Sequence, residues 1–142
     1  MVKLQNVPQT KHKNNMYTIG DLMIRLKNGY MARKSSIKCL YSHFSQALLD
    51  KLQQLEYIQS YTIGDDVKKT IIVELRYNDG RPAITDVKIF SKPGQRRYIS
   101  AKKLKPVLSN LGHAILSSPL GLVTNHEARK KHVGGEFLFE IW

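Results

Sequence analysis

The sequence predicts an α+β protein made of two small packed domains. Amphipathic helical stretches alternate with strand-like stretches in the first half, an order of α-β-α-β-β, whereas the second half is mostly antiparallel strand with short helices. A chain of 142 residues with 42% hydrophobic residues is long enough to bury a core by folding alone. We expect a basic N-terminal arm at residues 1–17, an N-terminal domain at 18–83 and a C-terminal domain at 84–142.

The first predicted helix begins at Thr18, which has the spacing of a capping box with Asp21. Its apolar residues recur at helical spacing and define one buried face: Ile19, Leu22, Met23, Leu26 and Tyr30. Arg25 and Asn28 fall on the opposite side, where each is free to meet a phosphate or simply solvent. Solvent is the more ordinary role for either residue alone.

A second helix is expected from Ser42, its cap, to about Glu56, with an inner stripe of Phe44, Leu48, Leu52 and Leu55. An edge strand is expected before it, at residues 37–40, and two strands after it, at residues 57–63 and 67–77. In the last of these, every second residue is apolar: Ile71, Val73, Leu75 and Tyr77. That alternation predicts a sheet covered on one face by the two helices.

The turn sequence Asn78-Asp79-Gly80 leads into a strand at residues 84–90, which joins the two halves. Further strands are expected at residues 97–100, 113–118 and 136–142. Two short helices should interrupt them. One starts with Pro106 and stops before Gly112, and the other begins after Thr124, which has capping-box spacing with Glu127.

The net charge of the chain indicates which class of molecule it binds. Lys and Arg total 23 against 11 Asp and Glu, a formal net charge of +12, so the surface should attract a polyanion. No apolar run approaches the roughly 18 to 20 residues of a membrane span, and no segment combines a basic face with a broad apolar one. Nucleic acid is therefore favoured over a membrane surface or a merely soluble basic protein.

No set of residues supports catalysis or a bound cofactor. Cys39 is the only cysteine, which excludes a disulfide framework or a cysteine-rich zinc site within the chain, and a lone cysteine is usually a small buried residue. The segment from His126 to His132 lacks the second histidine four residues after the first that a zinc-protease helix needs. Glycine-rich phosphate loops of either standard spacing are also missing from the sequence. We expect neither an enzyme nor a metal site.

Two loops are candidates for nucleic-acid contact. Ser117-Ser118-Pro119-Leu120-Gly121 offers hydroxyls and backbone amides that can reach an RNA minor groove, although its composition alone favours an ordinary hairpin turn. The second loop, residues 92–98, carries three cations and an aromatic residue, namely Lys92, Arg96, Arg97 and Tyr98. This composition suits contact with phosphates. The alternative interpretation is an ordinary solvated basic loop.

A family resemblance rests on motifs of the last third of the chain. In order these are Ser91-Lys92-Pro93-Gly94 with Tyr98, Leu111-Gly112-His113-Ala114-Ile115, Ser117-Ser118 with Gly121, Glu127-Ala128-Arg129, and Gly134-Gly135-Glu136. They resemble the C-terminal domain of the small-subunit ribosomal protein eight family, of bacterial or organellar type. Weaker similarity at Asp21, Arg25 and Asn28 extends the resemblance to residues 18–142.

The resemblance implies a structural protein that binds the central domain of small-subunit ribosomal RNA early in assembly and has no catalytic activity. By position it assigns RNA contact to Ser117, Ser118 and Gly121, with Arg25, Asn28 and Arg129 as further candidates. The family usually has Ser and Lys at the two positions that are Pro119 and Leu120 here, which puts contact at those positions in doubt. Ribosomal proteins of families two and five are the expected neighbours.

The acid-free arm fits an organellar import segment or a disordered basic tail. Together with the departures in the serine loop, it makes a mitochondrial ribosome the preferred location and the bacterial cytoplasm the second. Two other functions stay open, a regulatory RNA binder that acts on messenger RNA and, less favoured, an RNA-modifying enzyme.

Overall fold

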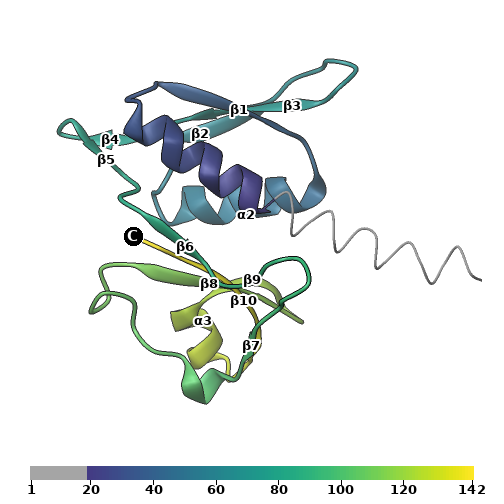
Figure 1. Cartoon of the computed structure of the whole chain (residues 1–142), viewed down its shortest axis with the longest axis vertical. Helices are drawn as coiled ribbons and strands as arrows, with labels where there is room; N and C mark the ends of the chain where they lie inside the picture. Colours follow the sequence, from purple (N-terminus) through teal and green to yellow (C-terminus); the bar gives the residue numbers. More distant parts are fainter. Residues whose placement is uncertain (1–18) are drawn as a thin grey trace, which may run out of the picture.

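Two helices cover one face of a three-stranded antiparallel sheet in the N-terminal half (Figure 1). The structure is a computed structural model and describes residues 19–142, so the predicted arm and the Thr18 cap lie outside the described residues. Residues 19–31 are helical, and α2 spans His43–Gln54. The sheet order is β1-β3-β2, formed by β1 (Ser36–Leu40), β2 (Ser60–Ile63) and β3 (Thr70–Glu74).

The helical patterns predicted the buried faces correctly. All five residues predicted for the apolar face of the first helix are buried, whereas Arg25 and Asn28 are exposed. Ser42 caps α2 by accepting a hydrogen bond from the Ser45 amide at 3.0 Å. Leu48 and Leu52 of the predicted stripe are fully buried, Phe44 and Leu55 are half-buried, and Leu49 is an additional core residue. The α+β prediction is confirmed, although β2 and β3 are shorter than expected.

The Asp79-Gly80 turn joins two short strands, β4 (Tyr77–Asn78) and β5 (Arg81–Pro82). Both turn residues have positive φ, 52° and 78°, as a tight hairpin of this kind requires. This confirms the predicted turn between the two halves.

The C-terminal half is a twisted antiparallel sheet in the order β6-β10-β8-β9, with β7 also paired to β10. The strands are β6 (Val87–Ile89), β7 (Tyr98–Ile99), β8 (His113–Ser118), β9 (Gly121–Thr124) and β10 (Gly135–Ile141). The helix α3 (Asn125–Lys130) and the short 3-10 helix η1 (Ala101–Lys103) lie beside it (Figure 1). Because β10 pairs with three other strands, it holds the sheet together.

Two expectations for this half are corrected. The helix predicted to start at Pro106 is wrong, because Leu108, Ser109 and Asn110 all have positive φ, which a right-handed helix cannot contain. They form a loop that Val107 and Gly112 close by bridging. The strand β9 was not predicted, whereas α3 begins with the expected Thr124–Glu127 capping box.

Apolar packing joins the two halves. One core cluster contains the buried faces of both N-terminal helices and also Ile115, Leu138, Phe139 and Ile141 of the C-terminal sheet. A smaller cluster under α3 lies entirely in the C-terminal half. The domain boundary at residue 84 stays a prediction, and the shared core indicates that neither half buries its apolar surface alone.

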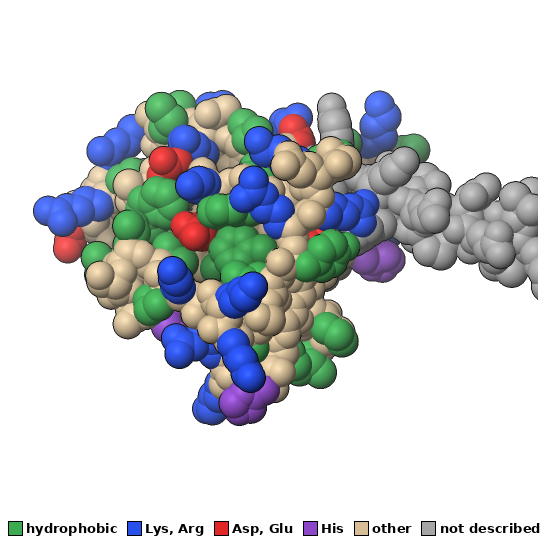
Figure 2. All heavy atoms as spheres, turned by 60° about the horizontal axis from the view of Figure 1, so that its bottom comes forward, with side chains coloured by type: hydrophobic (Ala, Val, Ile, Leu, Met, Phe, Trp, Pro, Cys, Tyr) green, Lys and Arg blue, Asp and Glu red, His purple; other side chains and the backbone are tan. Residues whose placement is uncertain are grey.

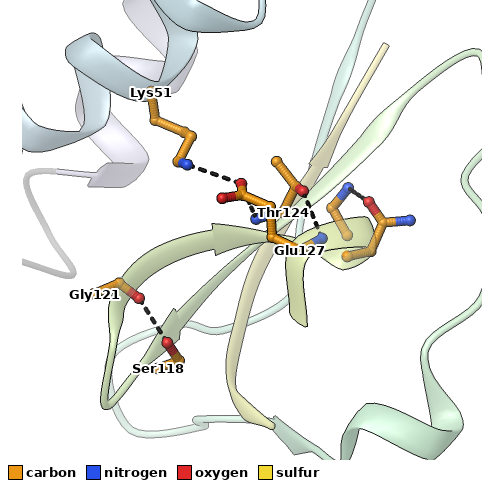
Figure 3. A network of polar contacts seen from close by, with 7 residues as sticks. Lys51, Ser118, Gly121, Thr124 and Glu127 are labelled. Atoms are coloured by element: carbon orange, nitrogen blue, oxygen red, sulfur yellow. Dashed lines mark hydrogen bonds and ion pairs between the residues drawn. The ribbon is translucent and has the colours of Figure 1, made fainter. Parts of the chain in front are cut away.

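Ion pairs add to this junction. Lys51 of α2 reaches Glu127 of α3 at 2.8 Å, and Glu127 also accepts a hydrogen bond from the Thr124 amide at 3.1 Å (Figure 3). Lys27 of the first helix meets Asp86 at 2.7 Å. The Lys51 side chain is only 14% exposed, so this charge depends on its partner more than a surface lysine does.

Replacing Glu127 with Ala removes both the ion pair to Lys51 and one arm of the capping box. We expect the free energy of unfolding to fall by about 1–2 kcal/mol, measured by urea denaturation. Asp21→Ala is the matched control, because its pair with Arg25 has both side chains more than half exposed and should contribute no more than roughly 0.5 kcal/mol. Equal losses in the two variants would contradict a stabilising role for the partly buried Lys51–Glu127 pair.

Candidate nucleic-acid interface

Strand register brings three separate motifs into one row across the C-terminal sheet. Tyr98 of β7 pairs with Glu136 of β10, Glu136 pairs with Ser117 of β8, and Ser117 pairs with Leu122 of β9. Directly paired residues of antiparallel strands point to the same face. The basic loop at residues 92–98, the Gly-Gly-Glu segment and the serine loop therefore present neighbouring side chains.

The serine loop is a tight hairpin with Pro119 and Leu120 at its tip. Ser118 pairs with Gly121, and its hydroxyl donates to the Gly121 carbonyl at 2.9 Å while accepting from the Leu120 amide at 3.1 Å (Figure 3). This leaves the Ser118 hydroxyl one lone pair for an outside donor. The Ser117 hydroxyl is half-exposed and forms no hydrogen bond within residues 19–142.

Glycines let β10 lie close to its neighbours in this row. A Cβ on Gly135 would fall 2.3 Å from the Ser117 carbonyl oxygen, and one on Gly134 would fall 2.5 Å from the Ile99 carbonyl oxygen. Both contacts are to backbone, which cannot swing aside. The Gly-Gly pair therefore fixes the spacing of Tyr98, Glu136 and Ser117.

Glu136 is the residue of this row that we did not select from the sequence. It is buried, and burial raises the pKa of its carboxyl group, while Arg96 and the Ser91 hydroxyl oppose that rise. Arg96, a predicted phosphate contact, is thus also placed to support the Glu136 carboxylate. The only signal in the sequence was the position of Glu136 after two glycines.

The start of α2 lies beside the serine loop and was also missed. A groove of about 650 Å³ is lined by Tyr41, Ser42, His43, Phe44 and Ala47 on one side and by Ser117, Gly121 and Leu122 on the other. The sequence identified Ser42 only as a helix cap. The groove shows that the N-terminal half contributes to the surface around the serine loop.

The second predicted loop is held by its own hydrogen bonds. Lys92 and Gln95 exchange backbone hydrogen bonds at 3.1 and 3.0 Å, Gly94 has a φ of 82°, and the Ser91 hydroxyl accepts from the Arg97 amide at 3.0 Å. Lys92, Arg97 and Tyr98 are exposed. These side chains are therefore available to an outside partner.

The remaining candidates lie elsewhere. Arg25 and Asn28 line a groove of about 580 Å³ together with Lys34 and Lys38, and Arg25 pairs with Asp21 at 2.8 Å. Arg129 is exposed in the last turn of α3. The structure thus brings the serine loop and the basic loop with Tyr98 into one surface, and leaves Arg25, Asn28 and Arg129 at separate places on the molecule.

The described residues give little support to a thiol nucleophile, a metal site or a membrane-spanning helix. Burial raises the pKa of the Cys39 thiol to about 11, so it is a poor nucleophile. Among residues 19–142, no group of three or more His, Cys, Asp or Glu side chains is arranged to hold a metal. None of the helices in the described part of the chain is long and apolar enough to cross a membrane.

His113, at the start of β8, contacts Tyr57 of the N-terminal half. Its Nδ1 lies 2.7 Å from the hydroxyl of Tyr57, and its ring meets that of His126 edge to face at 6.0 Å. Burial lowers the pKa of His113, the charge of His126 acts in the same direction, and Glu127 opposes both. The folded protein therefore resists protonation of this ring.

This shift predicts a pH dependence of stability. Below the ordinary histidine pKa of about 6.5 the unfolded chain takes up a proton at this position more readily than the folded chain does. Stability should therefore be fully present above pH 6.5 and decline as the pH falls toward 5. Thermal melts at intervals between pH 5 and 8 would show a shallower decline for His113→Gln, whereas the exposed His43→Gln should follow the wild type. Parallel curves for wild type and His113→Gln would contradict this role.

The chain is similar to known ribosomal proteins over most of its length. A profile of the family described as ribosomal protein S8 matches residues 17–142. A small ribosomal subunit protein uS8 from Mesorhizobium japonicum is 42% identical over 126 residues, covering 87% of this chain and 96% of the relative. The protein of the same name from Persephonella marina is 40% identical over 131 residues, with the same two coverages. Both sources are bacterial.

Proposed function

The chain belongs to the ribosomal protein S8 family, and on that premise we propose that it binds the central domain of small-subunit ribosomal RNA and supports subunit assembly. It is a structural constituent of the small ribosomal subunit and not an enzyme. The main support for this RNA-binding surface is the row of Tyr98, Glu136 and Ser117, which ends beside the serine hairpin.

The chemistry of this surface suits RNA with an irregular or open groove. Ser117 offers an uncommitted hydroxyl, Ser118 one lone pair, and Tyr98 an exposed ring on which a base can stack. Lys92 and Arg97 lie within the adjoining turn and can contact phosphates. We include Tyr41 and His43 in the surface because they share a groove with Ser117.

The two kinds of contact can be separated by salt. Ser117→Ala should weaken binding to a central-domain rRNA fragment by up to about tenfold without changing the slope of log affinity against log salt, because a hydroxyl releases no counterion. Lys92→Ala should reduce that slope by about one unit or less and weaken binding to all RNAs similarly. Fluorescence anisotropy at four salt concentrations measures both. Full affinity of Ser117→Ala under every condition would remove this residue from the interface.

Co-sedimentation tests the function as a whole. The tagged protein should migrate with small subunits in a sucrose gradient. A dedicated regulator of messenger RNA, the second candidate, would stay in the light fractions.

For the location we propose a mitochondrial ribosome, with the bacterial cytoplasm as the alternative. The support is the acid-free sequence of residues 1–17 and the replacement of the family's Ser and Lys by Pro119 and Leu120. Deleting residues 2–17 from a fluorescently tagged chain in a eukaryotic cell should abolish mitochondrial import, and unchanged localisation would refute the proposal. Proteins of families two and five are proposed as neighbours, which cross-linking within purified subunits would test.

A further inference from the structure

A third groove lies on the sheet face opposite the serine row. Phe137 pairs with Leu116, and Ile99 pairs with Gly135, so by alternation both side chains point away from the face that carries Ser117 and Tyr98. They line a groove of about 430 Å³ together with Phe90, Arg97, Lys103, Lys105, Pro106 and Glu140. Tyr98 also borders this groove, so Arg97 and Tyr98 are shared with the proposed RNA surface, whereas the apolar residues Phe90, Ile99 and Phe137 are not part of that surface.

The ring of Phe90 is not required by either core. It lies outside both hydrophobic clusters, and its aromatic neighbour is Phe137, edge to face at 4.7 Å. The Lys88 ammonium group is 5.1 Å and the Arg97 guanidinium 6.0 Å from the centre of the Phe90 ring. A half-exposed ring with two cations beside it resembles the platforms on which nucleic-acid bases stack.

Positive charge surrounds the groove. Lys88, Arg97, Lys103 and Lys105 are all exposed, and within residues 19–142 none of the four forms an ion pair. Glu140 is the one acidic side chain of the lining. Figure 2, which brings the C-terminal half forward, shows apolar side chains with many Lys and Arg side chains around them and few acidic ones.

We propose that this groove binds an unpaired nucleotide of RNA. The base stacks on Phe90, the flanking phosphates meet Arg97, Lys103 and Lys105, and Glu140 accepts a hydrogen bond from a donor on the base edge. An apolar protein segment fits less well, since covering the groove with it would desolvate cations that form no ion pair within residues 19–142. The inference rests on the proposed function, because ribosomal RNA supplies the nucleotide.

The test compares RNA with and without bases, using the full chain. Phe90→Leu keeps an apolar side chain but removes the ring, and it should bind a single-stranded adenosine decamer about tenfold more weakly than the wild type. Its affinity for a decamer of abasic ribose phosphates should be unchanged. Lys103→Ala should weaken binding to both strands, and Lys68→Ala, an exposed lysine on the β2–β3 turn, is the control of equal charge.

Cross-linking identifies where on the protein the RNA strand binds. A decamer with one central 4-thiouridine should cross-link to the segment between residues 88 and 106, and Phe90→Leu should lose this product. Equal affinity of Phe90→Leu and wild type for the adenosine decamer, or cross-links confined to residues 117–122, would overturn the proposal. Normal RNA binding by Phe90→Leu together with lost co-sedimentation would identify a protein occupant instead, which also overturns it. Failure of the wild type to bind central-domain rRNA would reject the proposed function separately.

Discussion

Gly135→Ala is expected to lower the free energy of unfolding by on the order of 3 kcal/mol or more and to abolish specific RNA binding. A Cβ at this position would lie 2.3 Å from the Ser117 carbonyl oxygen, 2.9 Å from its carbonyl carbon and 3.1 Å from the Ser118 Cα. All three atoms are backbone, so β10 must separate from β8 where the two strands carry Glu136 and Ser117. Urea denaturation and anisotropy with the rRNA fragment measure the two effects.

Gly20→Ala is the matched control. A Cβ at Gly20 meets nothing within 4 Å, and Gly20 is helical, so Ala there should be neutral or stabilising by up to about 1 kcal/mol. A Gly135→Ala protein with wild-type stability would show that the strands can shift to accept a methyl group. The close packing of β10 against β8 would then not set the interface.

Gly121→Ala should weaken cognate RNA binding by more than about tenfold while costing roughly 1–2 kcal/mol of stability. The residue has a φ of 100°, which strains any side chain, yet its Cβ would meet no atom of the protein within 4 Å. The stability loss therefore reports backbone strain. A loss of RNA-binding free energy larger than this loss of stability indicates a collision between the added side chain and the RNA.

Gly80→Ala is the control that distinguishes backbone strain from a collision with RNA. Gly80 also has a positive φ, 78°, and open space around its Cβ, but it lies in the β4–β5 hairpin of the other half. It should lose similar stability and keep its RNA affinity. If Gly121→Ala behaves in the same way, the glycine is only conformational and the hairpin backbone does not approach RNA closely.

Local patterns in the sequence predicted much of the fold. The apolar spacing of Leu22 and Leu26 and the alternation of Ile71 and Val73 each depend on neighbours only a few residues away, so they were readable. The helix expected after Pro106 failed because the rule that places proline at a helix start cannot foresee positive φ at Leu108. That conformation accompanies the bridge between Val107 and Gly112, and Gly112 packs against Ile141, which lies far along the chain.

The candidate site was predictable as loops but not as a surface. Serines, glycine and basic residues marked the two loops by composition alone. Their meeting depends on register among β7, β8 and β10, which pairs Tyr98, Ser117 and Glu136 across long sequence separations. The burial of Glu136 and the groove at Tyr41 follow from that same packing, and no short pattern in the sequence encodes them.

The position of β10 in the sheet also sets when the interface can exist during synthesis. Residues 135–141 are made after every strand with which they pair, so β6, β7 and β8 leave the ribosome without their shared neighbour. Part of the core under the N-terminal helices is then also missing, because Leu138, Phe139 and Ile141 complete it. Long-range pairing of this kind delays folding until the late segment emerges. The row of Tyr98, Glu136 and Ser117 therefore cannot form before residue 136 has been translated, although Ser117 and Tyr98 are made much earlier.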